Sequence, residues 1–374
     1  MKVICDRAAL LEAVNLVAGV VSGRTPTPVL QCIKLTAADG TLTLAATDLE
    51  IGLRIGVDQV DVQKAGEALL PADKLVQITR ASEDPTLTIE VKDHAVHIRG
   101  ADSHFKVFGY DPKEAPAVRE FGDVKVDCEI DGGVLRTLIA RTLFAAAAEH
   151  SRYAINGVLF EREGRKLRLV ATDGRRLAMA RGECKPVAGP KEGKVTCIVP
   201  TKALSLLGKL ISDPEATVRM ANEENQAIFA VGSGTDAAVL STNLVEGAFP
   251  PFEDVIPKDQ DKKVTFDCAT LSSAIRRAAL LTNEESKGVR MSFADKKLTV
   301  TSRAPEMGEA EIHVDLNKYE GDPLDIGFNP QYISDALKVV DGAEVIVELK
   351  APNKPGVLRT GSEFTYVIMP VNLQ

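Results

Sequence analysis

The sequence lacks several features that would place a protein in a specialised class. No apolar run approaches the ~20 residues that a membrane-spanning helix needs. The first six residues contain no basic stretch followed by an apolar block, so no secretory signal is predicted. The six cysteines are scattered and form no CxxC pair, which indicates reduced, mostly buried thiols and a cytoplasmic location.

Motifs that carry chemistry are also scarce. The chain contains no Gly-rich phosphate loop, no nucleophile motif and no His/Cys set with metal-ligand spacing. His94 and His97 come closest to such spacing, but on a strand they would face opposite sides. Asp48 and Asp173 each follow a predicted strand, where catalytic carboxylates often lie, yet neither has an adjacent base, and an aspartate in an Asp-Gly turn is usually structural. We therefore expect no enzymatic activity, no metal and no cofactor.

The charge of the chain is acidic overall but unevenly distributed. A net charge of −8 argues against a nucleic-acid-binding protein when the 374 residues are taken as a whole. The predicted helices are nevertheless net positive, while acidic residues gather in strands and loops. If the helices share one face, that face attracts polyanions. The helical cations are Arg7, Lys74, Arg80, Arg136, Arg141, Lys202, Lys209, Arg276, Arg277 and Lys338.

A long internal repeat organises the chain. Short strands that end near Cys5, Cys128 and Cys268 precede amphipathic helical runs, and similar segments recur at intervals of about 125 to 130 residues, the size of a whole domain. Each copy is predicted to contain two β-α-β-β-β units, so the fold class is α+β. Segments rich in proline and charge separate the copies. The predicted domains are 1–120, 121–257 and 258–374. The helical runs are 7–20, 133–146 and 271–281, and a second helix of each copy begins near Pro71, Pro200 and Asn329.

One predicted hairpin, LRLVATDGRRLAMA at 167–180, combines charge with an apolar surface. Apolar residues alternate on both sides of an Asp173-Gly174 turn, as in two antiparallel strands. Arg175 and Arg176 are expected at its tip beside Leu177, where they could meet a ligand. The alternative is an ordinary solvated hairpin.

Several motifs accompany the repeat: Arg24 with Pro26 and Pro28, SRYAING at 151–157, ATDGRRLA at 171–178, Phe249-Pro250, LTNE at 281–284 and YVIMP at 366–370. The repeat and these motifs resemble the bacterial sliding clamps, the beta subunits of DNA polymerase III, from Met1 to Gln374. The resemblance implies a DNA-clamp fold of three repeated domains, and a head-to-tail homodimer forming a ring whose helices line a central hole around duplex DNA. It implies a processivity factor that tethers the polymerase III alpha subunit, the clamp loader delta subunit and other proteins with clamp-binding peptides.

The resemblance also implies three sets of site residues. The DNA-facing set is Arg24, Arg152, Tyr153 and Lys202, and the dimer interface set is Lys74, Leu280, Leu281, Glu306 and Glu309. The peptide-binding pocket is Arg152, Ile155, Thr172, Gly174, Arg175, Arg176, Leu177, Pro250, Val255, Tyr332, Val367, Met369, Pro370 and Val371.

The chain departs from the family pattern at several positions, among them four that leave its peptide specificity open. Many members have His in place of Arg175 and an aromatic residue in place of Ala154, and Ser286 and Asn372 differ in size or charge from the common residues. A second hypothesis is a repeat-built scaffold that binds peptides in the same pocket without encircling DNA.

Overall fold

The computed structural model describes the chain except residues 22, 24, 93–94, 123, 149–153, 188–193, 233–236, 283–287, 295, 317, 341 and 373–374. The chain forms two compact units. Unit 1 comprises 1–136, 184–193 and 202–244, and unit 2 comprises 137–183, 194–201 and 245–374. In the described part of the chain, no helix is long and apolar enough to cross a membrane.

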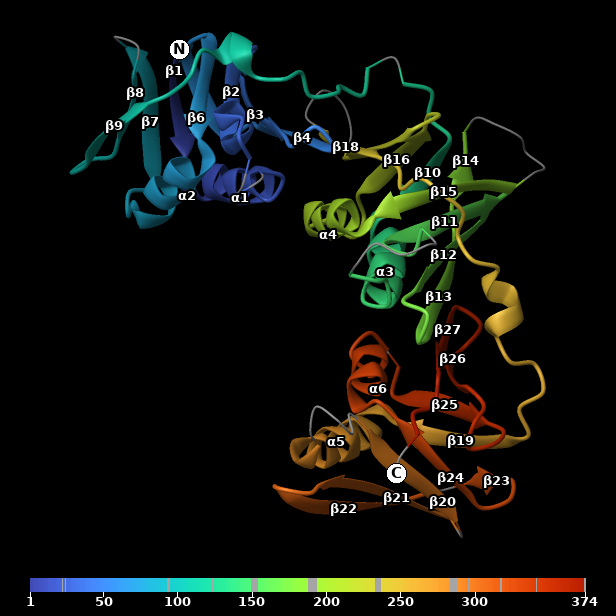
Figure 1. Ribbon diagram of the computed structural model, residues 1–374. Coiled ribbons are helices and arrows are strands. Elements are labelled where there is room, and N and C mark those ends of the chain that lie inside the picture. The colour runs from blue at the N-terminus through green and yellow to red at the C-terminus, as the bar shows by residue number, and fades with distance from the viewer. Residues whose placement is uncertain are drawn as a thin grey trace. The chain divides into compact units, whose positions relative to one another are not determined.

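Unit 1 contains two antiparallel sheets (Figure 1). The five-stranded sheet has the order β5-β1-β7-β8-β9, and the nine-stranded sheet has the order β14-β10-β16-β17-β18-β4-β3-β2-β6. The strands are β1 (Lys2–Asp6), β2 (Cys32–Ala38), β3 (Thr41–Thr47), β4 (Ile51–Val57), β5 (Val60–Lys64), β6 (Gly66–Pro71), β7 (Thr86–Lys92), β8 (Ala95–Arg99), β9 (His104–Phe108), β10 (Cys128–Asp131), β14 (Lys185–Pro186), β16 (Thr217–Asn222), β17 (Gln226–Val231) and β18 (Ala238–Asn243). The helices are α1 (Arg7–Ala18), α2 (Ala72–Ala81), α4 (Thr201–Leu210) and the start of α3 (Gly132–Leu143).

Unit 2 repeats this plan with a nine-stranded sheet, β15-β11-β12-β13-β27-β26-β25-β19-β23, and a four-stranded sheet, β22-β21-β20-β24. Its strands are β11 (Gly157–Glu163), β12 (Lys166–Thr172), β13 (Arg176–Glu183), β15 (Lys194–Pro200), β19 (Lys262–Asp267), β20 (Val289–Ala294), β21 (Lys297–Ala304), β22 (Gly308–Asp315), β23 (Tyr319–Glu320), β24 (Leu324–Phe328), β25 (Glu344–Leu349), β26 (Gly356–Thr360) and β27 (Phe364–Ile368). Its helices are the rest of α3, α5 (Cys268–Ala278), α6 (Pro330–Leu337) and the short turns η4 (Phe252–Val255) and η5 (Ala279–Leu281).

The order of elements confirms the threefold repeat. The described strands and helices follow the same succession from β1 to β9, from β10 to β18 and from β19 to β27. Each copy also contains a short strand that the sequence pattern did not predict, β5, β14 or β23, which pairs with the first strand of its copy. These strands are short or polar, so they carry little alternation to detect.

The residue that recurs where the first helix of each copy begins is aspartate. The expectation that a cysteine marks the end of each first strand is wrong. Asp6, Asp131 and Asp267 each accept a hydrogen bond from a backbone N–H in the first turn of the following helix, at 2.9, 3.2 and 2.7 Å. Such side chains satisfy N–H groups that lack a partner within the helix. The cysteines occupy different places, because Cys128 begins β10 and Cys268 begins α5.

Strands of successive copies pair across the boundaries between copies. In unit 1, β4 of the first copy pairs with β18, the last strand of the second. In unit 2, β13 of the second copy pairs in the same antiparallel way with β27, the last strand of the third. The corresponding strand of the third copy is β22, which lies at the edge of its sheet, and β9, the last strand of the first copy, also lies at an edge.

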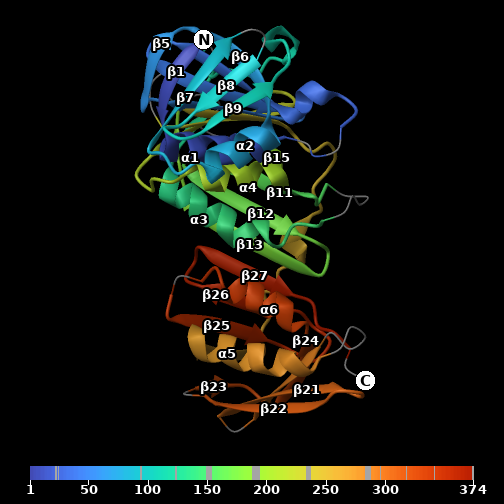
Figure 2. The ribbon, with the colours of Figure 1, turned by 90° about the vertical axis from the view of Figure 1, so that its left-hand side faces the viewer.

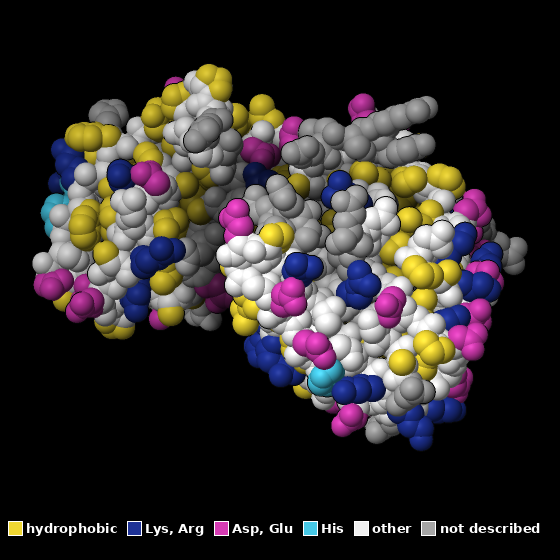
Figure 3. Space-filling model, turned by 60° about the horizontal axis from the view of Figure 1, so that its bottom comes forward, with side chains coloured by type: hydrophobic (Ala, Val, Ile, Leu, Met, Phe, Trp, Pro, Cys, Tyr) yellow, Lys and Arg dark blue, Asp and Glu magenta, His cyan; other side chains and the backbone are white. Residues whose placement is uncertain are grey.

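Within each unit the helices pack in pairs against apolar sheet faces. α1 contacts α2, and α5 contacts α6, so each pair lies side by side in both ribbon views (Figures 1 and 2). The buried positions of α1 (Leu10, Ala13, Val14 and Val17) have the spacing of one helix face. On the face drawn in Figure 3, basic and acidic side chains are interspersed.

The pairing of β4 with β18 yields the first testable prediction. Leu53 is fully buried and lies opposite Leu240 in this pair. Leu53→Ala should lower the free energy of unfolding by about 2–5 kcal/mol, because it leaves a cavity at the junction. Leu49 is 64% exposed, and Leu49→Ala should change that free energy by less than ~0.5 kcal/mol. Urea denaturation of the two variants checks this, and equal losses would contradict a packed junction.

Candidate functional site

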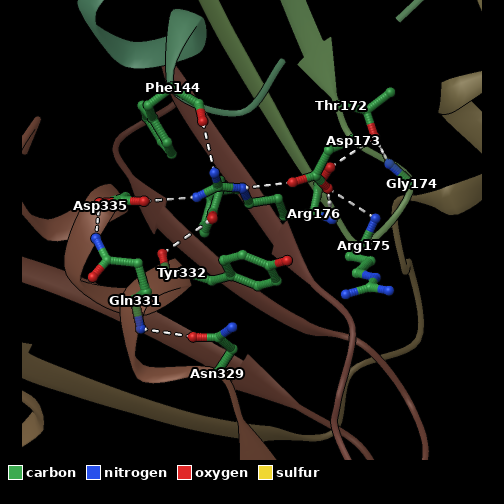
Figure 4. Close-up of polar contacts among 11 residues, drawn as sticks. Phe144, Thr172, Asp173, Gly174, Arg175, Arg176, Asn329, Gln331, Tyr332 and Asp335 are labelled. Carbon is green, nitrogen blue, oxygen red and sulfur yellow. Dashed lines mark hydrogen bonds and ion pairs between the residues drawn. The ribbon is translucent and has the colours of Figure 1, made fainter. Parts of the chain in front are cut away.

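The hairpin of β12 and β13 turns through 173–175 and is held by its own side chains (Figure 4). Asp173 Oδ1 accepts the backbone N–H groups of Arg175 and Arg176 at 2.9 and 3.0 Å. Thr172 Oγ1 accepts the N–H of Gly174 at 3.1 Å and donates to the carbonyl of Arg176 at 2.7 Å. Gly174 has φ +84°, a conformation that glycine adopts without steric cost. The Asp173-Gly174 turn is therefore confirmed.

The same hydrogen bonds recur in the first copy, at the turn between β3 and β4. Thr47 Oγ1 accepts the N–H of Leu49 and donates to the carbonyl of Ile51, and Asp48 Oδ1 accepts the N–H of Ile51 at 2.7 Å. Leu49 occupies the glycine position with φ +77°. Asp48 and Asp173 are thus both occupied in fixing turns, which is the structural role expected for them.

Arg176 is largely buried, and the expectation that it projects from the hairpin tip is wrong. Its side chain is 11% exposed. Nε donates to Asp173 Oδ2 at 3.0 Å, one terminal nitrogen donates to Asp335 Oδ2 at 2.9 Å, and the other donates to the carbonyl of Phe144 at 2.7 Å. The guanidinium also stacks 4.5 Å from the ring centroid of Tyr332. Arg176 therefore ties the hairpin to the end of α3 and to α6.

The protonation of this cluster follows from its contacts. Burial opposes the charge of Arg176, but the contacts with Asp335, Tyr366 and Asp173 together outweigh it and raise the pKa of the guanidinium above its ordinary value. Burial alone would raise the pKa of Asp335, yet hydrogen bonds from Arg176, Lys338 and Gln331 hold that pKa below its ordinary value. Burial raises the pKa of Tyr366, against the influence of Arg176. The pair of Arg176 and Asp335 is consequently charged at neutral pH.

An apolar cluster lies beside this network, where β13 pairs with β27. Leu177 lies opposite Val367, and the N–H of Met369 donates to the carbonyl of Arg175 at 2.9 Å. Val245, Phe249 and Ile256 pack against the cluster. Its buried members are Ala154, Leu159, Val170, Leu177, Met179, Ile198, Phe252, Val357 and Val367.

Two apolar side chains near this cluster remain open to solvent. Val255 is 46% exposed and Met369 is 40% exposed. Pro250, Pro370 and Val371 are partly buried. An exposed methionine beside a packed apolar floor is an adaptable surface for an apolar ligand.

The structure thus brings together most of the residues expected in the peptide pocket. Ile155 and Thr172 are buried, Tyr332 is partly buried and Arg175 is exposed. The pattern did not indicate Phe144 and Asp335, the other partners of Arg176, since they lie 32 and 159 residues away along the chain. Arg24, Arg152 and Tyr153 lie outside the described residues, as do His94 and Ser286.

The cations on the helices differ in whether they bond to a carboxylate. Lys202 Nζ bonds Asp48 at 2.7 Å and the carbonyl of Val20 at 2.9 Å, so it helps to join α4 to the first copy. Five others are exposed and have no carboxylate partner among the described residues: Arg80, Arg136, Lys209, Arg276 and Arg277.

Four of the residues expected at a dimer interface lie on or near the edge strand β22, and the fifth, Lys74, lies on α2. Leu280, in η5, is 71% exposed, and Leu281 follows it as a partly buried residue. Lys74 pairs with its neighbour Asp73, and Glu309 pairs with Arg303; Glu306 is exposed. Two exposed apolar residues beside the edges were missed, Phe108 on β9 and Met307 before β22, at 73% and 62%.

Comparison with known protein families covers nearly the whole chain. Residues 1–119 match the N-terminal domain of the DNA polymerase III beta subunit, 129–251 match its central domain and 253–372 match its C-terminal domain.

Individual relatives match over their full length. The beta sliding clamp of Pseudomonas putida is 34% identical over 98% of this chain and 99% of the relative, and that of Escherichia coli K12 is 31% identical over 100% of both. The crystal structure of the DNA polymerase III subunit beta from Pseudomonas aeruginosa has a TM-score of 0.88 and 33% identity over 100% of both chains. A sliding clamp from the same organism, crystallised with griselimycin, has a TM-score of 0.90, 33% identity and the same coverage.

The contacts of Arg176 yield the second prediction. Arg176→Ala leaves Asp173 without its cation and Asp335 with Lys338 alone, and it should cost about 3 kcal/mol of unfolding free energy. Arg176→Lys keeps the charge but cannot reach three acceptors at once, and should recover less than half of that loss. Arg175→Ala, at the exposed neighbouring position, should cost less than ~0.5 kcal/mol. Denaturation of the three variants decides this; equal effects at 175 and 176 would contradict the network.

Proposed function

The chain belongs to the family of DNA polymerase III beta subunits and is a DNA sliding clamp, and from this premise we propose how its residues perform that function. We propose that two copies form a closed ring around duplex DNA, in the cytoplasm, with no catalytic activity of their own. We further propose that each copy docks the alpha subunit of DNA polymerase III, the clamp loader delta subunit and other proteins through short peptides. The domains would be 1–120, 121–257 and 258–374.

The single observation that supports the ring most strongly is the way in which strands of successive copies pair. β4 pairs with β18, and β13 pairs with β27, so the same strand of one copy meets the last strand of the next. Only the third copy's β22 and the first copy's β9 are left at sheet edges under this rule. A second chain placed head to tail would pair β22 with β9 twice, and such a heterologous contact closes when the rotation closes.

The residues near these edges support this pairing. Exposed sheet edges with apolar side chains favour association with another chain. Phe108 lies on β9, while Leu280 and Met307 lie near β22, and all three are more than half exposed. We propose that Lys74, Leu281, Glu306 and Glu309 contribute to the same contact.

The exposed helix cations support loose, sequence-independent contact with DNA. Arg80, Arg136, Lys209, Arg276 and Arg277 are free of carboxylate partners in the described part of the chain. Scattered charges of this kind attract phosphates without reading bases. We propose that Arg24, Arg152, Tyr153 and Lys202 join them, with Lys202 contributing less because Asp48 already balances it. A ring needs no tighter contact, since closure keeps it on the duplex.

The proposed peptide pocket lies at the junction of β13 and β27. Met369, Val255 and Arg175 form its exposed part, and Leu177 and Val367 form its floor. Arg176 holds the hairpin in place, so the pocket is preorganised before a peptide arrives. A scaffold that binds peptides without encircling DNA would share this pocket, but would need neither the unpaired edges nor the free helix cations.

The exposed methionine yields the third prediction. Met369→Ala should weaken binding of the clamp-binding peptide of the organism's own polymerase alpha subunit about tenfold, because it removes an apolar contact at the pocket centre. Deletion of 369–374 should abolish binding. Met307→Ala removes a methionine outside the pocket that is more exposed than Met369, and it should change peptide affinity less than about twofold.

Fluorescence anisotropy with a labelled peptide measures these affinities, and sedimentation velocity monitors the dimer. Met369→Ala and the deletion should leave the dimer intact. Unchanged peptide affinity in the deletion variant would show that the pocket has been assigned to the wrong place.

A further inference from the structure

A cavity of about 610 Å³ lies on the nine-stranded sheet of unit 2, beneath the segment that follows η4. Met179, Ile256 and Pro257 form an apolar wall, and Glu253 and Glu348 are the carboxylates of the lining. The remaining charged side chains of the lining are all cations: Arg168, Arg181, Lys258, Lys262, Lys263 and Arg359. A cluster of this sign is unusual in a chain whose net charge is −8.

The strand register brings the three arginines onto one face of the sheet. Arg168 on β12 lies directly opposite Arg181 on β13. Arg359 on β26 lies opposite Thr365, which in turn lies opposite Met179. Because alternate residues share a face, Arg181 follows Leu177 and Met179 along the same side of β13. The cationic groove therefore adjoins the apolar cluster of the peptide pocket and shares Met179 and Ile256 with it, but its arginines and lysines are not part of that cluster.

The three guanidiniums are not equally compensated. Arg168 bonds Glu253 at 2.8 Å and also Glu161, and Arg359 bonds Glu348 at 2.9 Å. Arg181 has no carboxylate partner among the described residues, and its side chain donates only to the carbonyl of Ser362, at 3.0 Å. Burial, together with the nearby charges of Arg168 and Arg359, lowers the pKa of Arg181 below its ordinary value.

This arrangement costs stability as it stands. Like charges directly opposite each other on neighbouring strands are destabilising. Glu161 and Glu253 balance the charge of Arg168, whereas Arg181, an exposed residue, has no carboxylate partner among the described residues. Departures from local stability of this kind are concentrated at functional sites, where a ligand supplies the missing interaction.

We propose that this groove binds a compact oligophosphate anion, either an inorganic polyphosphate or the phosphate chain of a nucleotide. Guanidinium groups match phosphate oxygens with paired, charge-assisted hydrogen bonds. The volume lies within the ordinary range for small-molecule sites, about 300–1,000 Å³. Arg181 supplies a guanidinium group that has no carboxylate partner among the described residues. Lys258, in the segment after η4, and Lys263, on β19, supply further positive charge.

The test is a calorimetric titration of the full-length chain with tripolyphosphate and with ATP, in low salt. Both should bind, and binding should weaken steeply as salt is added. Equal affinities would assign the phosphate chain alone as the ligand, and tighter binding of ATP would assign a nucleotide; either result supports the proposal. Arg181→Gln should weaken binding at least about tenfold, the loss of a charged hydrogen-bonding group.

Arg165→Gln is the matched control. It removes the same charge from the turn between β11 and β12 of the same sheet, but Arg165 lies outside the groove with a side chain that is 71% exposed. It should change affinity less than about twofold. The proposal is overturned if neither anion binds, if both variants lose affinity equally, or if polyglutamate binds while tripolyphosphate does not, since the last result would assign the groove to an acidic polypeptide.

Discussion

The pairing of one repeat's hairpin strand with the last strand of the next repeat is the constraint on which the rest of the structure depends. At β4–β18 and at β13–β27, backbone hydrogen bonds continue a sheet across the boundary between copies. Each compact unit therefore combines parts of two copies, and neither boundary is a free linker. The same rule leaves β9 and β22 with open edges, so the dimer that we propose follows from the repeat itself.

The peptide pocket is a product of the second junction. Leu177 and Val367 belong to successive copies but are far apart in sequence, and they meet because β13 pairs with β27. Arg176 then crosslinks the hairpin, α3 and α6 through three hydrogen bonds and a stacked ring. The charge of Arg176 therefore holds the apolar site rigid and is not free to bind a ligand. Arg181 is the opposite case, because it has no carboxylate partner among the described residues.

Periodicity predicted the local elements well but could not predict what joins them. The hairpin at 167–180 and the second helix of each copy were recognised because alternation and capping are short-range signals. The buried state of Arg176 was missed because its partners Phe144 and Asp335 are remote in sequence. The repeated cysteine was misleading, because it occupies a different structural position in each copy. The feature that recurs is the cap on the first helix, which Asp6, Asp131 and Asp267 provide.

The most direct test of the ring is retention on DNA of two topologies. The chain would be loaded with a clamp loader and ATP onto a circular duplex, washed with high salt, and followed before and after the circle is cut once. A topologically closed ring stays on the circle through the wash, because it needs no electrostatic attraction, and it slides off the linear form. Equal loss from both forms would contradict encirclement and would favour a peptide-binding scaffold.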